Sequence, residues 1–85
     1  MFDRNDRNAS ENVIAAAKAE TSDLRGMRIM RARRNDRGWL LKYVALDDDF
    51  PIAAIERSLT RKLGEMVRMV NLHYDFDTAA RLIYA

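Results

Sequence analysis

The feature that most constrains this fold is the segment Asn35–Gly38, with the sequence Asn-Asp-Arg-Gly, which separates two runs of strand-forming residues. Such a segment favours a type I turn followed by a left-handed glycine, the common three-residue hairpin loop. That loop predicts a register with the opposing pairs Asn35–Trp39, Arg33–Leu41, Arg31–Tyr43 and Ile29–Ala45. The sequence therefore predicts an antiparallel β-hairpin on either side of this turn.

Successive side chains of a strand point to opposite sides, so this register divides the hairpin into two faces. The more apolar face is expected to pack on the core, and its apolar members are Met30, Ala32, Leu40, Val44 and Leu46. The basic members of the same face, toward its ends and middle, are Arg28, Arg34 and Lys42. The other face interleaves two arginines with two aromatic residues: Arg31, Arg33, Trp39 and Tyr43. A slip of one residue would exchange the two faces.

The hairpin also holds the positive charge of the chain. The net charge is only +2, but residues 25–42 contain seven basic residues and one acidic residue, and the segments on either side are net acidic. The basic residues of this block are Arg25, Arg28, Arg31, Arg33, Arg34, Arg37 and Lys42. A local concentration of positive charge attracts polyanions more strongly than a small net charge would. The block therefore indicates nucleic acid or an acidic protein surface as a ligand.

A long amphipathic helix is predicted from Ile52 to Leu72, because apolar residues recur there at intervals of three and four. The apolar stripe consists of Ile52, Ile55, Leu59, Leu63, Met66 and Val70. Pro51 suits the start of this helix, where its missing N–H costs nothing. The opposite side carries a second basic strip, made of Arg57, Arg61 and Arg68.

Shorter helices are predicted at both ends of the chain, one over residues 10–24 and one that Asp77 caps and that continues through residues 79–84. Residues 1–9 are polar and are expected to be flexible. The chain is long enough for one domain. We therefore predict a single small α+β domain over residues 10–85, in which a two-stranded antiparallel hairpin packs on the long helix with short flanking helices.

The composition argues against several function classes. The chain has no cysteine, which excludes disulfides, thiolate catalysis and cysteine-based zinc sites. No apolar run approaches the roughly 20 residues of a membrane span, and the first residues lack the apolar core of a signal peptide. These features predict a soluble, cytoplasmic protein that does not contact a membrane.

Two groups of polar residues could carry chemistry, but neither has the right pattern. The run Asp47–Asp49 matches a strand exit followed by a helix N-terminus, and consecutive carboxylates do not converge on one metal ion. His73 lies near Asp75 and Asp77, but the chain contains no second histidine with which it could form a metal site. We therefore expect no catalytic residue, no metal ligand and no cofactor, and we expect that the protein is not an enzyme.

The leading hypothesis is a small regulatory protein that contacts nucleic acid through the basic hairpin. In this hypothesis arginines contact phosphates and base edges, while Trp39 and Tyr43 stack on unpaired bases. The predicted binding residues are Arg28, Arg31, Arg33, Arg34, Arg37, Trp39, Lys42, Tyr43, Arg57, Arg61 and Arg68. If helices cover both faces of the hairpin, however, Trp39 and Tyr43 belong to the core instead.

Three alternatives remain open. The protein could be an inhibitor or adaptor that blocks a larger complex by direct contact, in the manner of phage-encoded anti-CRISPR proteins, since arginine-rich patches with aromatic residues also suit protein interfaces. It could form a homodimer through the Ile52–Val70 helix, whose length exceeds what one hairpin covers. Residues 50–72 could also form a helix-turn-helix, with the hairpin as a wing against the DNA backbone.

Overall fold

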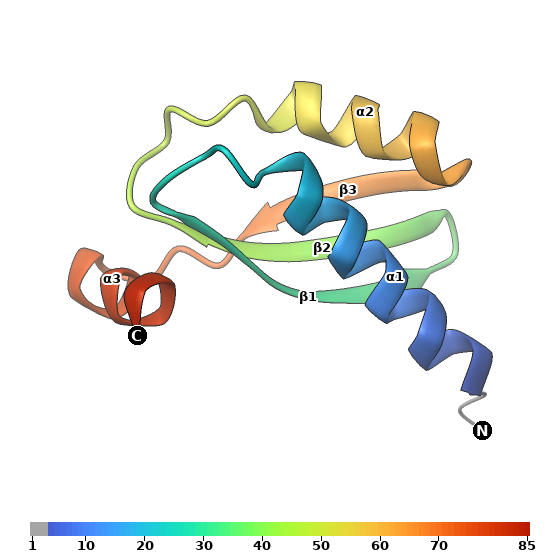
Figure 1. Cartoon of the computed structure of the whole chain (residues 1–85), viewed down its shortest axis with the longest axis horizontal. Helices are drawn as coiled ribbons and strands as arrows, with labels where there is room; N and C mark the ends of the chain where they lie inside the picture. The colour runs from blue at the N-terminus through green and yellow to red at the C-terminus, as the bar shows by residue number, and fades with distance from the viewer. Residues whose placement is uncertain (1–3) are drawn as a thin grey trace.

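The computed structural model describes residues 4–85, with side chains from Asn8 onward, and has an α+β fold (Figure 1). In chain order the elements are α1 (Arg4–Glu20), β1 (Met27–Asn35), β2 (Gly38–Ala45), α2 (Ile52–Leu63), β3 (Met66–Asn71) and α3 (Phe76–Tyr84). The strands form one mixed sheet in the order β1-β2-β3, with β1 and β2 antiparallel and β2 and β3 parallel. The predicted class and the hairpin are confirmed, but the sheet contains a third strand.

The hairpin turn is one residue shorter than predicted, because Asn35 pairs directly with Gly38. The side-chain oxygen Asn35 Oδ1 accepts the backbone N–H of Arg37 at 2.9 Å, a local bond that stabilises the tight turn. Trp39 consequently lies opposite Arg34. The predicted register is therefore wrong by one residue next to the turn.

Farther from the turn, the pairing of β1 with β2 is interrupted by an irregularity between Ile29 and Arg31. The pairing passes over Met30, so that Ile29 lies opposite Tyr43 and Arg31 opposite Lys42. An extra residue of this kind changes which side chains share a face. The face predicted to pack on the core is therefore wrong except at Ala32, and the core-facing residues of the hairpin are Ile29, Ala32, Trp39, Leu41 and Tyr43.

The predicted long helix is also wrong, since α2 ends at Leu63. Gly64 adopts a left-handed conformation with φ of 72°, and its N–H donates to the carbonyl of Thr60 at 2.9 Å, which terminates the helix. The next residues, Met66–Asn71, form β3, where buried and exposed residues alternate. Apolar residues at 66, 67, 69 and 70 fit both a helical stripe and an alternating strand, so periodicity alone could not separate the two.

This break affects two of the alternatives that depended on one helix. A helix-turn-helix over residues 50–72 is wrong, because the second half of that segment is a strand in the sheet. The Ile52–Val70 helix that was predicted to form a dimer surface is not formed, since α2 ends at Leu63 and Ile55 and Leu59 are buried in the core of their own chain. Homodimerisation itself stays a prediction. The segment instead forms a β-α-β unit, in which α2 connects the parallel strands β2 and β3.

The terminal helices differ in their boundaries from the prediction. The first helix begins at Arg4 and not at residue 10, because the preceding polar residues contain no helix breaker. The last helix begins at Phe76, and its cap is Asp75 instead of Asp77. Asp75 has extended backbone angles and accepts the N–H of Thr78 at 2.7 Å. Hydrogen bonding from the Thr78 side chain, and then from this N–H, lowers the pKa of the Asp75 carboxyl group.

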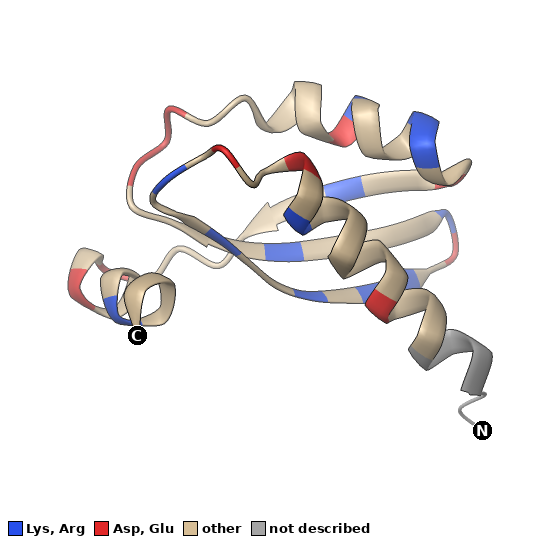
Figure 2. Cartoon of the chain, in the orientation of Figure 1, with Lys and Arg blue, Asp and Glu red and all other residues tan. Residues whose placement is uncertain are grey.

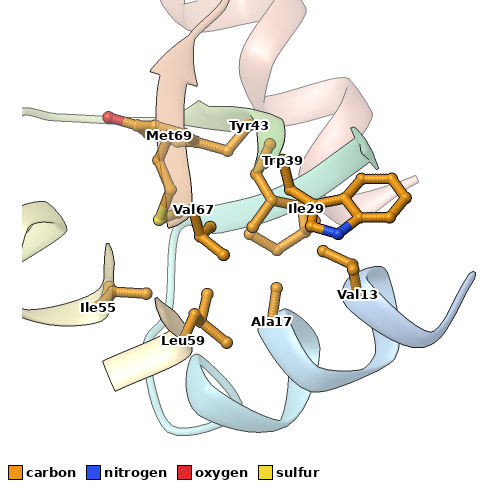
Figure 3. Packing of buried hydrophobic residues seen from close by; sticks show 10 residues of the cluster. Val13, Ala17, Ile29, Trp39, Tyr43, Ile55, Leu59, Val67 and Met69 are labelled. Atoms are coloured by element: carbon orange, nitrogen blue, oxygen red, sulfur yellow. The ribbon is translucent and has the colours of Figure 1, made fainter. Parts of the chain in front are cut away.

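The core lies between one face of the sheet and the helices α1 and α2, which lie side by side over that face (Figure 1). Figure 3 shows Val13 and Ala17 of α1 and Leu59 of α2 pointing toward Trp39 and Val67 of the sheet. The buried cluster consists of Val13, Ala17, Ile29, Trp39, Leu41, Tyr43, Ile55, Leu59, Val67 and Met69. Alanines on α1 let this helix approach the sheet closely, which explains why a helix with few large side chains can still bury the aromatic residues.

The second face of the sheet is covered at one end only. Val44 points away from the α1–α2 core and is nevertheless fully buried, because α3 packs on β1 and β2 at this end of the sheet. Ala79 of α3 is buried at this contact, and the guanidinium of Arg28 donates a hydrogen bond to the carbonyl of Leu82. The remainder of this face is open toward solvent and forms the site described next.

Candidate nucleic-acid interface

The uncovered part of the second sheet face contains side chains from all three strands in regular rows. Residues that pair across neighbouring strands point to the same side, and the register gives the rows Asn35–Gly38–Met66, Arg33–Leu40–Arg68 and Arg31–Lys42–Val70. We call this surface the open sheet face. Figure 2 shows basic residues on each of the three strands that form it.

Basic residues dominate the open sheet face. Arg31 lies directly opposite Lys42, and in the next row Arg33 and Arg68 flank Leu40. Neighbouring strands are about 4.8 Å apart and alternate residues of one strand about 7 Å, so four cationic side chains begin within a small rectangle. The three rows contain no aspartate or glutamate. Like charges placed directly opposite each other destabilise a sheet, so the arrangement of Arg31 and Lys42 has a cost.

These four cations are also available to a ligand. Arg31, Arg33 and Arg68 are exposed and Lys42 is half-buried. Within residues 8–85, no ion pair joins any of them to a carboxylate. Their positive charge therefore remains directed toward solvent, where it attracts an anion.

Two other basic residues, by contrast, form ion pairs with carboxylates of the same chain. Lys62 of α2 pairs with Glu20 of α1 at 2.5 Å, and this bond lowers the pKa of the Glu20 carboxyl group. Arg34 pairs with Glu65 at 2.8 Å, and its guanidinium lies 4.4 Å from the centre of the Trp39 ring. Both pairs involve partners outside the three rows of the open sheet face, so they do not neutralise it.

Apolar side chains accompany the cations. Leu40 is half-buried at the centre of the face, and Met66 and Val70 of the edge strand β3 are 46% and 41% exposed. A hollow of about 140 Å³ lies at the turn end of the sheet. Its lining residues are Asn35, Arg37, Trp39, Met66 and Arg68. The surface thus combines positive charge with exposed apolar area. This combination would complement a ligand that has both anionic and apolar parts.

The two aromatic residues predicted to stack on bases lie outside the rows of the open sheet face, although Trp39 contributes to the lining of the hollow. Trp39 is 2% exposed and Tyr43 is 7% exposed, and both point into the core under α1 and α2. Removal from water raises the pKa of the Tyr43 hydroxyl, and the nearby carboxylates of Asp48 and Glu56 raise it further. The open sheet face therefore carries Arg31 and Arg33 beside Leu40 and Lys42, and not beside the aromatic pair.

The remaining predicted residues are distributed over three regions. Arg28 contacts α3, and Arg37 lies at the turn beside the hollow. Arg57 and Arg61 are exposed on α2, which packs on the opposite side of the sheet. Arg68, which the helical interpretation grouped with these two, lies on β3 and joins the open sheet face.

The sequence prediction missed the apolar members of the site. Leu40 was predicted in the core, whereas Met66 and Val70 were predicted in the stripe of a long helix. The signal that could have identified them is the alternation in Met66–Asn71, in which the buried residues Val67 and Met69 separate exposed ones. In a strand of only six residues, alternation alone does not show which side faces the core. The pairing with the neighbouring strand determines this.

The acidic residues and the histidine considered for metal binding or catalysis lie outside the rows of the open sheet face. Asp47–Asp49 are exposed in the connection before α2, and His73 is exposed after β3 with a left-handed φ of 56°. Among residues 8–85, no three histidine, aspartate or glutamate side chains come close enough together to hold a metal ion. Of the helices between residues 4 and 85, none combines the length and hydrophobicity that crossing a membrane requires.

Comparisons with known proteins add no relative to this description: no family model, no curated protein and no solved structure matches the chain. The open sheet face must therefore be interpreted from its own geometry.

Proposed function

We propose that this protein is a small non-enzymatic regulatory protein that binds nucleic acid through its open sheet face. The single observation that carries the proposal is the set of basic residues in adjacent rows, with Arg31 opposite Lys42 and with Arg33 and Arg68 on either side of Leu40. The phosphate backbone of a nucleic acid is a regularly spaced polyanion, which complements a regularly spaced array of cations.

Binding of nucleic acid would also account for the like-charged pair of Arg31 and Lys42 on the sheet. Arg31 and Lys42 repel each other in the free protein, and a bound phosphate between them would turn this repulsion into two favourable contacts. Interactions of this kind release counterions from the nucleic acid and therefore weaken as salt increases. If the four cations contact about four phosphates, the logarithm of the affinity for a single strand should fall with a slope of about −3 against the logarithm of the salt concentration.

The experiment is a titration of fluorescently labelled DNA and RNA oligonucleotides with the full chain at several salt concentrations. The double variant Arg33→Gln/Arg68→Gln should weaken binding and reduce the salt slope. The matched control is Arg57→Gln/Arg61→Gln, which removes the same charge from α2 on the other side of the sheet. The proposal is wrong if no oligonucleotide binds at low salt, or if the two double variants weaken binding equally.

A second candidate function is that of a protein-binding inhibitor or adaptor, and a different surface supports it. The last helix and the residue before its cap expose three large aromatic side chains: Tyr74 at 48%, Phe76 at 65% and Tyr84 at 65%. Exposed aromatic residues are typical anchors of protein interfaces. A protein complex that resists nuclease and is lost in Phe76→Ser/Tyr84→Ser, but not in Arg33→Gln/Arg68→Gln, would favour this candidate over nucleic-acid binding.

A further inference from the structure

The exposed apolar residues of the open sheet face indicate which form of nucleic acid would bind there. Met66 and Val70 lie on either side of Arg68 along β3 and point to the same side of the sheet. Leu40 occupies the centre of the row between Arg33 and Arg68. Apolar positions therefore alternate with cationic ones along β3 and across the row Arg33–Leu40–Arg68, and a complementary ligand offers apolar surface at the same small spacing as its charge.

A double helix does not offer that combination. Its outside presents phosphates and sugars, whereas the faces of its bases are stacked on one another and inaccessible. Contact with a duplex would place phosphates against Leu40, Met66 and Val70, which removes water from charges without providing a hydrogen bond. The apolar residues would therefore oppose duplex binding and leave only the cations to favour it.

The hairpin also lacks the shape for reading a duplex groove. A two-stranded ribbon can enter the major groove, which is about 12 Å wide. Here β2 pairs with β3 over its residues Gly38–Tyr43, so the hairpin is built into a three-stranded sheet with β2 at its centre and does not project as a ribbon. The helices α1 and α2 further thicken the sheet on its other face (Figure 1). A broad face of this kind suits a flexible strand that lies across it.

An unpaired strand does offer both kinds of surface. Its phosphates are spaced along the backbone, and each unstacked base has a flat apolar face that can lie against side chains. The hollow beside Met66 and Arg68 continues this surface toward the hairpin turn, where Asn35 and Arg37 also line it. The side chain of Asn35 is held in place by the N–H of Arg37, so it is preorganised.

From these observations we infer that the ligand of the open sheet face is single-stranded nucleic acid, with bases lying on Leu40, Met66 and Val70 and phosphates held by Arg31, Arg33, Lys42 and Arg68. The inference rests on the proposed function, since it names the form of nucleic acid that the same surface takes. It assigns to the apolar side chains a role that a simple polyanion would not require.

The experiment compares three probes of equal length: a single-stranded oligodeoxynucleotide, the same strand in a duplex, and a strand with abasic sites, which keeps every phosphate but lacks bases. The base-bearing single strand should bind tightest. Met66→Gln/Val70→Thr should weaken binding of this strand roughly tenfold, because two apolar contacts become polar. The same variant should leave binding to the abasic strand unchanged, since no phosphate contact is altered.

The variant is suited to this comparison because both residues are exposed and their replacements are close in size, so folding should be retained. A circular-dichroism melting curve like that of the parent chain verifies this. Equal affinity for the abasic and base-bearing strands, or tighter binding to the duplex, would overturn the inference while Arg33→Gln/Arg68→Gln still supported the proposed function. Absence of binding to every probe would overturn both.

Discussion

The indole N–H of Trp39 donates to Glu65 Oε2 at 3.0 Å. The other carboxylate oxygen, Glu65 Oε1, accepts a hydrogen bond from Arg34 Nη1 at 2.8 Å, and the guanidinium of Arg34 lies over the indole ring. One carboxylate thus joins a residue of β1 to a residue of β2 at the point where the chain enters β3. This cluster gives Arg34 a structural role. Its neighbours Arg31 and Arg33, by contrast, lie on the open sheet face.

The Glu65 cluster predicts a specific loss of stability in acid. Hydrogen bonds from Arg34 and Trp39 lower the pKa of the Glu65 carboxyl group below its usual value. A group with a lowered folded-state pKa contributes stability above its unfolded-state pKa, and this contribution disappears as the pH falls through the folded-state value. The free energy of unfolding of the parent chain should therefore decline below about pH 4 through this group.

The variant Glu65→Gln tests this dependence, since glutamine keeps an acceptor for the indole N–H but has no carboxyl group to protonate. Urea denaturation between neutral and strongly acidic pH should show a smaller decline for Glu65→Gln than for the parent chain. Asp77→Gln is the control, because Asp77 is an exposed acidic residue outside this cluster. Identical declines for Glu65→Gln and the parent would show that the cluster does not stabilise the fold.

Lys42→Glu should affect folding and binding in opposite directions. The change places opposite charges on Arg31 and residue 42, which face each other across β1 and β2, and should raise the free energy of unfolding by about 0.2–1 kcal/mol at low salt. It also places a negative charge on the open sheet face, so oligonucleotide affinity should fall roughly tenfold or more. Parallel denaturation and binding titrations measure the two effects.

Arg61→Glu is the matched control for this change, because it alters the net charge by the same amount on the exposed side of α2. Its effect on affinity should be small compared with that of Lys42→Glu. Equal losses would mean that net charge alone governs binding and that the open sheet face has no special role.

The two glycines Gly38 and Gly64 should differ in their tolerance of alanine. A Cβ on Gly38 would lie 2.2 Å from the carbonyl oxygen of Met66, a backbone atom of the paired strand, so Gly38→Ala must force β2 and β3 apart. A Cβ on Gly64 would meet nothing within 4 Å, and only the left-handed backbone opposes it. We expect a loss of about 3 kcal/mol or more for Gly38→Ala and about 1–2 kcal/mol for Gly64→Ala, measured by urea denaturation. The reverse order would contradict the close approach of β2 and β3.

Truncation of apolar residues should distinguish the two faces of the sheet. Leu59 is fully buried between α2 and the sheet, and Leu59→Ala should lower the free energy of unfolding by about 2–5 kcal/mol. Met66 is 46% exposed on the open sheet face, so Met66→Ala should cost less than about 1 kcal/mol. Similar losses at the two positions would show that the open sheet face is covered in solution.

Helix α2 should protect the outer edge of β3. The backbone N–H of Val67 donates to Thr60 Oγ1 at 3.0 Å, and that of Met69 donates to Glu56 Oε2 at 2.7 Å. Exposed strand edges promote pairing between chains, and side chains that occupy them prevent it. Thr60→Val should cost about 1 kcal/mol and accelerate hydrogen exchange at the Val67 amide.

The neighbouring amides of Arg68 and Val70 serve as the internal control for this experiment, because they point toward β2 and should keep their protection. With Glu56 replaced by leucine in addition, sedimentation should reveal self-association through the unprotected edge. A doubly substituted chain that stays monomeric with unchanged exchange would show that α2 is not needed to cover β3.

Local patterns were sufficient for the features that depend on neighbouring residues. The presence of a turn after Asn35, of a helix after Pro51 and of helices near both ends of the chain follows from side chains within a few positions of one another, although their exact boundaries do not. The clustering of positive charge between residues 25 and 42 is a property of the sequence alone. For these reasons the α+β class, the hairpin and the basic block could be predicted before any tertiary contact was known.

Only the tertiary structure decided which side of each strand is covered. The pattern Trp39-Leu40-Leu41-Lys42-Tyr43 has apolar residues on both sides, and the choice between them depends on a two-residue turn and on an unpaired Met30 in β1. The secondary structure of Met66–Asn71 likewise depends on a tertiary contact. This segment forms a strand because it pairs with the edge of β2. The sequence alone placed cations in one block. The long-range pairing of β3 with β2 brought Arg68 to them, and the packing of α1 and α2 on the other face of the sheet buried Trp39 and Tyr43.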